Sequence, residues 1–413
     1  MEQPNIFAYI PDNQYDYKKV FSGKDKPIRL FQAFSGIGCQ AMAFNRLGIP
    51  YVNVGTSEID KYAIMSYEAI HGDSNNYGDI SKMKEIPICD IFTWSFPCID
   101  LSKAGKQKGL QGGTRSGLVY EVLRLLHATE TKPKVLIMEN VVDLVQVKFA
   151  AEFYEIQNEI ASFGYKNYTQ VLNAKHYGVA QNRERVFMVS ILGNEHYEFP
   201  PRIRLEKRLK DYLEDEVDEK YYLSNKLIKC FEEHKERNDT SGGGNMEPKI
   251  LEETICLNSK VNGKQPSLQD RIYSSEGVAT AITDAFRPNI KEPNGFYKQA
   301  IETAQNNDIE YGDSINAFNQ QVDKSGCSPT ITTRPEGKKT AILPITHDLR
   351  IRKLTPKECW RLMGIDDADF DKAQKVVSNS QLYKQAGNGI VVDVFAAILK
   401  GLIFMEGEKN ESK

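Results

Sequence analysis

Short apolar runs alternate with amphipathic stretches along the first half of the chain. The runs at 28–34, 88–92 and 134–141 contain strong strand formers without polar alternation, which is typical of strands buried on both faces of a parallel sheet. The stretches at 39–48 and 149–164 carry apolar residues at helical spacing. The alternation predicts an α/β fold with a mostly parallel sheet. Further strands are expected at 51–60, 168–174 and 185–192, and a further helix at 118–129.

The pattern changes in the second half of the chain. From about residue 196 to 344 the segments are short, polar and rich in glycine, proline and asparagine, which predicts a smaller, loop-rich domain. This region holds a faint repeat, GVATAIT at 277–283 and GCSPTIT at 326–332. We expect four parts: an N-terminal extension at 1–26, a catalytic domain at 27–195, the small domain at 196–380 and a helix at 381–413 that returns to the catalytic domain.

Apolar periodicity returns near the C-terminus. Thr355 precedes a proline and lies three residues before Glu358, a capping-box pattern that predicts a helix start. The last apolar segment, 386–404, predicts one long helix packed on the main sheet, with Gly387 and Asn388 at its N-terminus.

Composition sets broad limits on the function. The chain has 413 residues, 40% of them hydrophobic, and no apolar run of membrane-spanning length. It lacks a signal-peptide pattern, and its seven cysteines lack paired or CxxC spacing, so we expect a cytoplasmic protein without a metal site. The net charge of −3 does not by itself indicate a nucleic-acid partner, because most nucleic-acid-binding domains carry a basic surplus. If DNA binds, its cleft must be locally basic.

A glycine turn, Ser35 to Gly38, follows the first strand and precedes a helix. Such a turn lets backbone amides approach a ligand at a helix N-terminus, although an ordinary tight turn has the same sequence. Glu58 follows Gly38 at the spacing of about 20 residues where related folds hold ribose hydroxyls. Ala41 stands where a pyrophosphate-binding turn has its third glycine. The spacing therefore favours an adenosine-containing ligand that has no pyrophosphate.

Cys98 is the candidate nucleophile. It follows the run at 88–92, and the carboxyl ends of parallel strands are where α/β sheets bind ligands. A buried cysteine that acts as a small hydrophobe is the commoner case. Glu139 ends the run at 134–141 and should emerge at the same edge, beside an irregular loop at 102–117 that could close over a substrate. Arg183 and Arg185 alternate as on an extended chain, which usually means solvent or phosphate contact.

Eight short motifs occur in a fixed order: FSGIG, SEID, GDI, FPC, ENV, QNRER, RKLTPKECWRLMG and GNGIVVDV. Together they resemble the cytosine-5 DNA methyltransferase family. The motifs run from about Leu30 to Val394, nearly the whole chain, interrupted by one long unmatched segment at roughly 196–345. The resemblance implies a Rossmann-like methyltransferase sheet that binds S-adenosylmethionine and a smaller target-recognition domain that binds double-stranded DNA. It further implies a monomer in a restriction-modification or phage-protection system, with any cognate restriction endonuclease acting separately.

The resemblance also assigns residues by their motifs. Cys98 would attack carbon 6 of a flipped cytosine, Glu139 would bond its N3 and amino group, and Arg183 and Arg185 would hold its carbonyl oxygen and the active-site loop. Phe34 would stack on adenine, Glu58 would take the ribose hydroxyls and Asp79 the adenine amino group. The implied cofactor residues are Phe34, Gly36, Ile37, Gly38, Glu58, Ile59, Asp79, Ile80, Pro97 and Asn388. The implied substrate-binding residues are Ser102, Asn140, Gln181, Thr330, Arg334 and Thr355.

Within the unmatched segment, Thr330 and Ile331 best fit the threonine-aliphatic pair that this family places near the bases. Arg334 follows in a turn-rich stretch, where it would read a guanine edge or contact phosphate. Three other readings stay open: a tRNA cytosine-5 methyltransferase, a DNA-binding relative without catalysis and a nicotinamide oxidoreductase. The long segment before residue 345 favours DNA, the intact candidate residues favour catalysis, and the missing pyrophosphate pattern disfavours nicotinamide.

Overall fold

The computed structural model describes residues 20–21, 26–97, 116–222 and 352–403, with shorter stretches between 300 and 344 of which 321–333 is the longest. Cys98, Ser102 and Arg334, the loop at 102–115, the first half of the repeat and most of the N-terminal extension lie outside the described residues.

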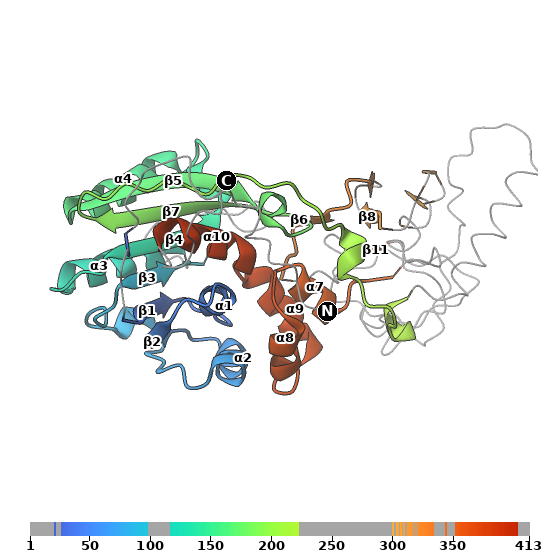
Figure 1. The fold of residues 1–413 in the computed structure, drawn as a ribbon, viewed down its shortest axis with the longest axis horizontal. Helices are drawn as coiled ribbons and strands as arrows, with labels where there is room; N and C mark the ends of the chain where they lie inside the picture. Colours follow the sequence, from blue (N-terminus) through green and yellow to red (C-terminus); the bar gives the residue numbers. More distant parts are fainter. Residues whose placement is uncertain are drawn as a thin grey trace, which may run out of the picture.

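A six-stranded sheet forms the centre of the molecule, in the order β2-β1-β3-β4-β7-β5 (Figure 1). The strands are β1 (Ile28–Ala33), β2 (Tyr51–Ser57), β3 (Ile91–Trp94), β4 (Val135–Val141), β5 (Tyr165–Asn173) and β7 (Glu184–Leu192). The first four strands pair in parallel, whereas β7 runs antiparallel to both β4 and β5. The chain passes from β1 to β2 on one side and then to β3 on the other. A topological switch point therefore lies between β1 and β3, where α/β sheets open a ligand crevice.

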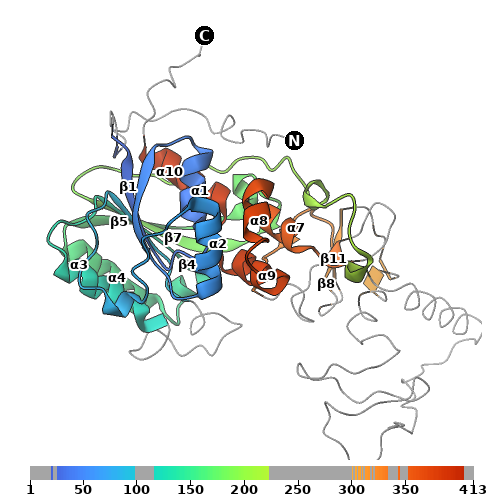
Figure 2. The same ribbon diagram turned by 90° about the horizontal axis from the view of Figure 1, so that it is seen from below.

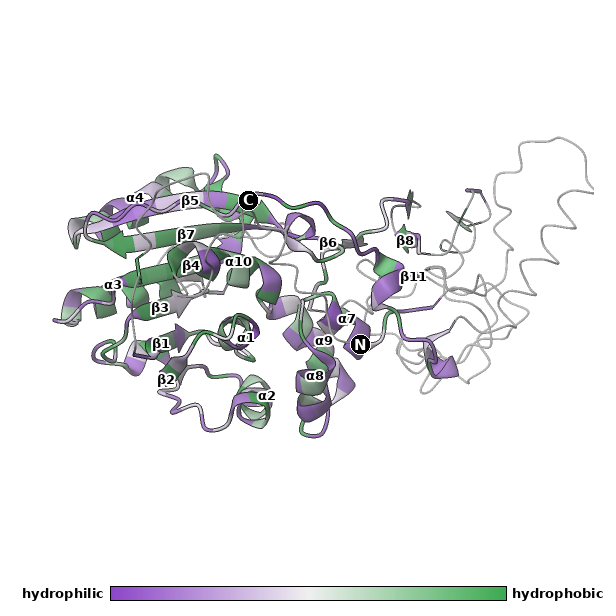
Figure 3. Cartoon of the chain, in the orientation of Figure 1, coloured by the Kyte–Doolittle hydropathy of each residue, from purple (hydrophilic) through white to green (hydrophobic). Residues whose placement is uncertain are grey.

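Helices cover both faces of this sheet (Figure 2). They are α1 (Cys39–Arg46), α2 (Lys61–His71), α3 (Val119–Ala128), α4 (Ala150–Ser162) and α10 (Val392–Leu402). Three further helices, α7 (Pro356–Arg361), α8 (Asp367–Ala373) and α9 (Asn379–Asn388), gather beside the sheet (Figure 1). Side chains of β4 alternate between two cores: Val135 and Ile137 join the α1 and α10 side, and Leu136 and Met138 join the α3 and α4 side. Burial on both faces explains the continuous apolar runs, which colour the inner strands green in Figure 3.

The described part of the second half has short strands. β8 (Ser314–Asn316), β9 (Gln321–Asp323) and β11 (Leu343–Pro344) form an antiparallel sheet, and β10 (Ser328–Pro329) pairs in parallel with β6 (Gln181–Asn182). The capping box is confirmed at α7, because the Thr355 hydroxyl accepts from Glu358 N and the Glu358 carboxylate accepts from Thr355 N. The four-part division of the chain stays a prediction.

Two details of the predicted elements are wrong. The strand expected at 88–92 begins only at Ile91, and Ile88 is 59% exposed because it precedes the sheet. The single final helix is interrupted: α9 ends at Asn388, and α10 starts at Val392. Gly387 and Asn388 therefore end one helix rather than begin the next. The carbonyl oxygens of Gly387 and Gly389 turn to the Arg183 guanidinium, which satisfies them at the break.

One stretch of the described residues, Asn379–Leu402, is long and apolar enough to be a candidate membrane span, but 78% of its window is buried inside the molecule. Its residues belong to the larger hydrophobic core, which is typical of the core helices of a globular protein.

Candidate active site

The glycine turn lies at the switch point. Phe34 follows β1 with a left-handed φ of 54°, and its N–H donates to the Ser57 carbonyl at the end of β2. Gly36 also has positive φ, and its N–H donates to Glu58 Oε2 over 3.0 Å. The turn is thus tied to the end of the neighbouring strand. A Cβ on Gly36 would meet nothing within 4 Å, so its backbone borders open space.

Carboxylates and apolar side chains gather around this turn. Glu58 Oε1 accepts from the N–H groups of Ile59 and Asp60, which holds its carboxylate at the start of α2. Asp79 accepts from the N–H and hydroxyl of Ser81, and these bonds lower the pKa of its carboxyl. Ile59 is 74% exposed at the rim, whereas Ile80 is buried. Acceptors beside an exposed aliphatic group fit an adenosine, whose hydroxyl and amino groups donate.

Asn76 joins these groups, although no motif singled it out. Its Oδ1 accepts from the N–H of Glu58 and from that of Gly78, and its Nδ2 donates to the Glu58 carbonyl. One amide thus holds the turn before Asp79 against the end of β2. An asparagine between two motifs carries no sequence signal that distinguishes it from a surface residue.

Gly38 packs against the last turn of α2. It has φ +80°, and a Cβ there would lie 2.6 Å from both His71 Nε2 and Tyr67 Cε2. His71 Nε2 is also 3.1 Å from the Ile37 carbonyl oxygen. Only glycine fits this position, because the backbone is left-handed and the two rings fill the space beside it.

Glu139 and Arg185 form an ion pair at the carboxyl end of β4. Arg185 Nε lies 3.2 Å from Glu139 Oε1, and Glu139 is 8% exposed. Burial raises the pKa of the Glu139 carboxyl, and the positive charges of Arg185 and Arg183 oppose this rise without cancelling it. Protonation of this buried carboxyl is therefore easier than that of an exposed one, and its protonated form can donate a hydrogen bond.

Asn140 connects this strand end to the segment that leads to Cys98. Its Nδ2 donates to the Phe96 carbonyl over 3.1 Å, and its Oδ1 accepts from Val141 N over 2.8 Å. Asn140 is 2% exposed, so both bonds are shielded from water. The structure therefore brings Phe96 and Pro97 to the edge that carries Glu139. The predicted place of Cys98 at this edge lies outside the described residues and stays a prediction.

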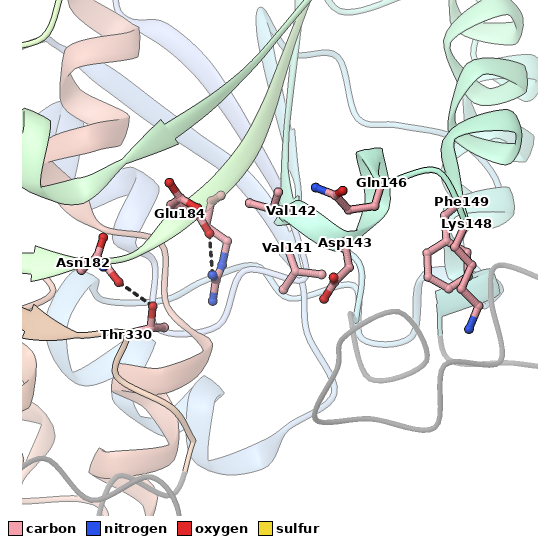
Figure 4. Close-up of a pocket in the computed structure, with 10 residues that line it drawn as sticks. Val141, Val142, Asp143, Gln146, Lys148, Phe149, Asn182, Glu184 and Thr330 are labelled. Carbon is pink, nitrogen blue, oxygen red and sulfur yellow. Dashed lines mark hydrogen bonds between the residues drawn. The ribbon is translucent and has the colours of Figure 1, made fainter. Parts of the chain in front are cut away.

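A cavity of about 650 Å³ opens beside the ion pair. Its walls come from the chain after β4, from the start of β7 and from the loop after β10 (Figure 4). The lining residues are Val141, Val142, Asp143, Gln146, Lys148, Phe149, Asn182, Glu184, Arg185 and Thr330. Sequence reasoning named only Arg185 and Thr330 among them. Five of the others, from Val142 to Phe149, follow the end of β4, which is the signal that could have indicated them.

Thr330 lies on the cavity wall, where its hydroxyl donates to the Asn182 carbonyl over 2.8 Å (Figure 4). Gln181 is fully buried: its amide donates to the Leu362 carbonyl and accepts from Ile331 N. Thr355 is 5% exposed, and its hydroxyl donates to Glu214. The substrate-binding roles of these residues stay predictions.

Arg183 does not face solvent, contrary to the expectation from its alternation with Arg185. It is 3% exposed and donates to three carbonyl oxygens, those of Ile331, Gly387 and Gly389. The chain bends between β6 and β7, where Arg183 N donates to the Gln181 carbonyl, so the two-residue period of a strand does not hold.

No group of side chains that could hold a metal ion occurs among the described residues.

Comparisons with known proteins identify the family of the chain. Residues 28–403 match the model of the C-5 cytosine-specific DNA methylase family. The type II methyltransferase M2.ScrFI of Lactococcus lactis subsp. cremoris is 31% identical over 91% of this chain and 99% of its own length. The orphan methyltransferase M.SPBetaI of Bacillus phage SPbeta is 32% identical over 91% and 97%.

Solved structures share the fold at low sequence identity. The Entamoeba histolytica methyltransferase EhMeth has a TM-score of 0.61 at 15% identity and covers 92% of this chain and 98% of its own. S. pombe Dnmt2 has a TM-score of 0.59 at 17% identity, with 91% and 98% covered. The predicted Rossmann-like methyltransferase fold is confirmed.

Proposed function

The chain belongs to the C-5 cytosine-specific DNA methylase family, and from this membership we propose that it methylates carbon 5 of a cytosine rotated out of a specific duplex site, through a covalent bond to Cys98. The observation that carries the proposal is the buried Glu139–Arg185 pair beside the Phe96–Pro97 segment. A restriction-modification or phage-protection role follows from the type II and phage relatives.

Carbon 5 of cytosine is a poor nucleophile, which sets the task of the site. When the Cys98 thiolate bonds to carbon 6, the electron pair of the 5,6 double bond makes carbon 5 nucleophilic, so one difficult step becomes two easier ones. S-adenosylmethionine would supply an electrophilic methyl group. Loss of the proton from carbon 5 then restores the double bond and expels the thiolate.

Glu139 would stabilise the attacked ring. Burial raises the pKa of this carboxyl, which favours the protonated form that can donate to N3 as charge develops there. Arg185 holds the carboxyl from the other side at 3.2 Å and would present its remaining donors to the carbonyl oxygen of the ring. The cavity beside the pair, about 650 Å³, is within the usual size of ligand pockets.

The residues around the glycine turn fit S-adenosylmethionine. Glu58 and Asp79 are acceptors for the ribose hydroxyls and the adenine amino group, and the exposed side chain of Ile59 would be covered by the adenine ring. The open space at Gly36 leaves room for a close approach of the backbone.

The duplex must release its target base, because a stacked cytosine cannot present carbon 6 to a thiolate. The segment from about 196 to 345 would form the second wall of the cleft and read the flanking bases. Thr330 supports this placement, since it lines the cavity from that segment. Arg334 would read a guanine edge from the same loop.

The decisive experiment offers the protein a duplex with 5-fluorocytosine at the target, together with S-adenosylmethionine. The fluorine cannot leave as a proton does, so the wild type should form a stable covalent adduct. Cys98→Ser should form none while still binding DNA, because a hydroxyl is far less ionised than a thiol.

Cys89→Ser is the matched control, because Cys89 is a buried thiol whose pKa burial raises to about 12. It should keep the adduct. A Cys98→Ser variant that still forms an adduct would refute the proposed nucleophile. If tritiated methyl groups from S-adenosylmethionine enter tRNA but not duplex DNA, tRNA would replace duplex DNA as the proposed substrate.

A further inference from the structure

Three segments that are distant in the sequence meet beside the cavity, and we call this contact the junction: 180–183, 328–331 and 387–389. Ser328 N donates to the Ala180 carbonyl over 2.5 Å, next to the pairing of β10 with β6. Ile331 N donates to Gln181 Oε1 over 3.0 Å, and Ile331 is fully buried. The loop after β10 is thereby fixed to the chain that enters β7.

Arg183 lies at the centre of the junction. One terminal nitrogen donates to the Ile331 carbonyl over 2.9 Å, and the other donates to the Gly387 and Gly389 carbonyls over 3.0 and 2.8 Å. Hydrogen bonds from a charged donor are about twice as strong as neutral ones. At 3% exposure, water cannot replace any of them without opening the junction.

The two other segments also touch each other directly. A Cβ on Gly387 would lie 2.2 Å from the backbone of both Thr332 and Thr333, so the end of α9 is packed against the loop after β10. Neither segment can shift alone, because movement of either would break hydrogen bonds between Arg183 and the backbone carbonyls and leave a buried donor or acceptor unpaired.

Two of the segments carry the proposed binding surfaces, and the third leads to the ion pair. Thr330 lines the cavity on the DNA side. Asn388, a candidate cofactor residue, stands between the two carbonyls that Arg183 holds at the end of α9. Arg185, two positions further along the chain, contacts Glu139. Arg183 thus contacts the segments that carry the two proposed surfaces, although it does not itself line the cavity.

We propose that Arg183 is a positioning residue that couples the two sides, so that cofactor and duplex strengthen each other's binding through it. This inference rests on the proposed function. Coupling of this kind is reciprocal, because the change that DNA causes in cofactor affinity equals the change that the cofactor causes in DNA affinity. Arg183 then acts through Ile331, Gly387 and Gly389 rather than by touching the cytosine.

The test measures this coupling by calorimetry. S-adenosylhomocysteine is titrated into the free protein and into the protein bound to a short duplex that carries its site, identified by sequencing methylated DNA from expressing cells. We expect about tenfold tighter binding with duplex in the wild type and little or no change in Arg183→Lys, because an ammonium group cannot reach three carbonyls as a planar guanidinium does.

Arg46→Lys is the matched control. Arg46 donates to the Gly364 carbonyl over 2.6 Å and pairs with Asp366 and Asp393, so it is a similar multiple donor outside the junction. It should keep the coupling factor even if it loses stability. Thr330→Val, which removes only the hydroxyl bond to Asn182, should reduce the factor and serves if Arg183→Lys does not fold.

An unchanged coupling factor in Arg183→Lys, or in Thr330→Val when the former does not fold, would overturn the inference. So would a wild type without coupling. A wild type that binds neither S-adenosylhomocysteine nor duplex would instead refute the proposed function.

Discussion

Arg185 Nε lies 3.2 Å from Glu139 Oε1, and the two residues come from the neighbouring antiparallel strands β7 and β4. Val141 is the partner of Arg185 in the ladder, so the guanidinium reaches back along β4 to the carboxylate. Because β4 is parallel to β3, the same pairing brings the ion pair to the edge that Phe96 and Pro97 reach. The reversed direction of β7 thus lets an arginine near the start of one strand meet a carboxylate near the end of another.

The stability of the protein should depend on the charge of Glu139. Its folded-state pKa is raised by burial, so the folded protein binds more protons than the unfolded chain above pH 4.5, and stability falls as pH rises through this window. The free energy of unfolding of Glu139→Gln, measured by urea denaturation, should therefore increase relative to that of the wild type as pH rises from about 4.5.

Glu195→Gln should show the opposite dependence of stability on pH. The hydrogen bond from Lys134 lowers the pKa of Glu195, so this carboxylate contributes stability that is lost as pH falls. The free energy of unfolding of the wild type should increase relative to that of Glu195→Gln as pH rises. The increase should be small, because both side chains of the pair are about a third exposed. A Glu139→Gln difference that does not vary with pH would contradict the assignment.

Gly38→Ala should damage the cofactor side. A left-handed alanine costs about 1–2 kcal/mol, and its Cβ must also displace the rings of Tyr67 and His71. We expect a lower melting temperature and weaker S-adenosylhomocysteine binding by calorimetry. Gly36 also has a positive φ, but a Cβ there would meet open space. Gly36→Ala should therefore lose only the free energy of the left-handed backbone. Equal effects of the two substitutions on melting temperature would rule out the steric argument.

Asn140→Ala should slow the formation of the covalent adduct. Loss of its amide leaves the buried Phe96 carbonyl unpaired, at a cost of about 1–3 kcal/mol, and releases the segment before Pro97 from β4. Adduct rates with a 5-fluorocytosine duplex should fall while cofactor affinity stays near that of the wild type. Asn167→Ala removes a similar bond, to the Gln157 carbonyl, far from this edge and should leave the rate unchanged. Equal rates in all three proteins would exclude a positioning role for Asn140.

Arg352→Met should be strongly destabilising. Arg352 and Glu358 are 1% and 0% exposed and form two hydrogen bonds, so the substitution leaves a buried carboxylate without its cation at a cost of about 3–5 kcal/mol. Arg29→Met breaks the ion pair between Arg29 and Asp90. Because the Arg29 side chain is 45% exposed, the loss in the free energy of unfolding should be no more than about 1 kcal/mol. Denaturant titration compares the two, and a similar loss in both would show that burial does not set the strength of the pair.

Local features of this chain could be predicted from its sequence. The continuous apolar run of β1, the glycine turn after it and the capping box at Thr355 each depend on residues a few positions apart. The boundaries near Ile88 and Asn388 were wrong, because the first lies at the solvent edge of the sheet and the second depends on where distant donors meet the helix carbonyls. The motif order indicated the family, which the comparisons confirm.

Tertiary structure alone decided the partners of the polar side chains. Arg183 and Arg185 look equivalent in QNRER, yet one is buried among the carbonyls of Ile331, Gly387 and Gly389 and the other faces Glu139. A hydrophobic period reports which side of an element is buried, because burial follows local spacing. It does not report which distant carbonyl or carboxylate meets a buried donor, since that depends on close packing between segments far apart in the chain.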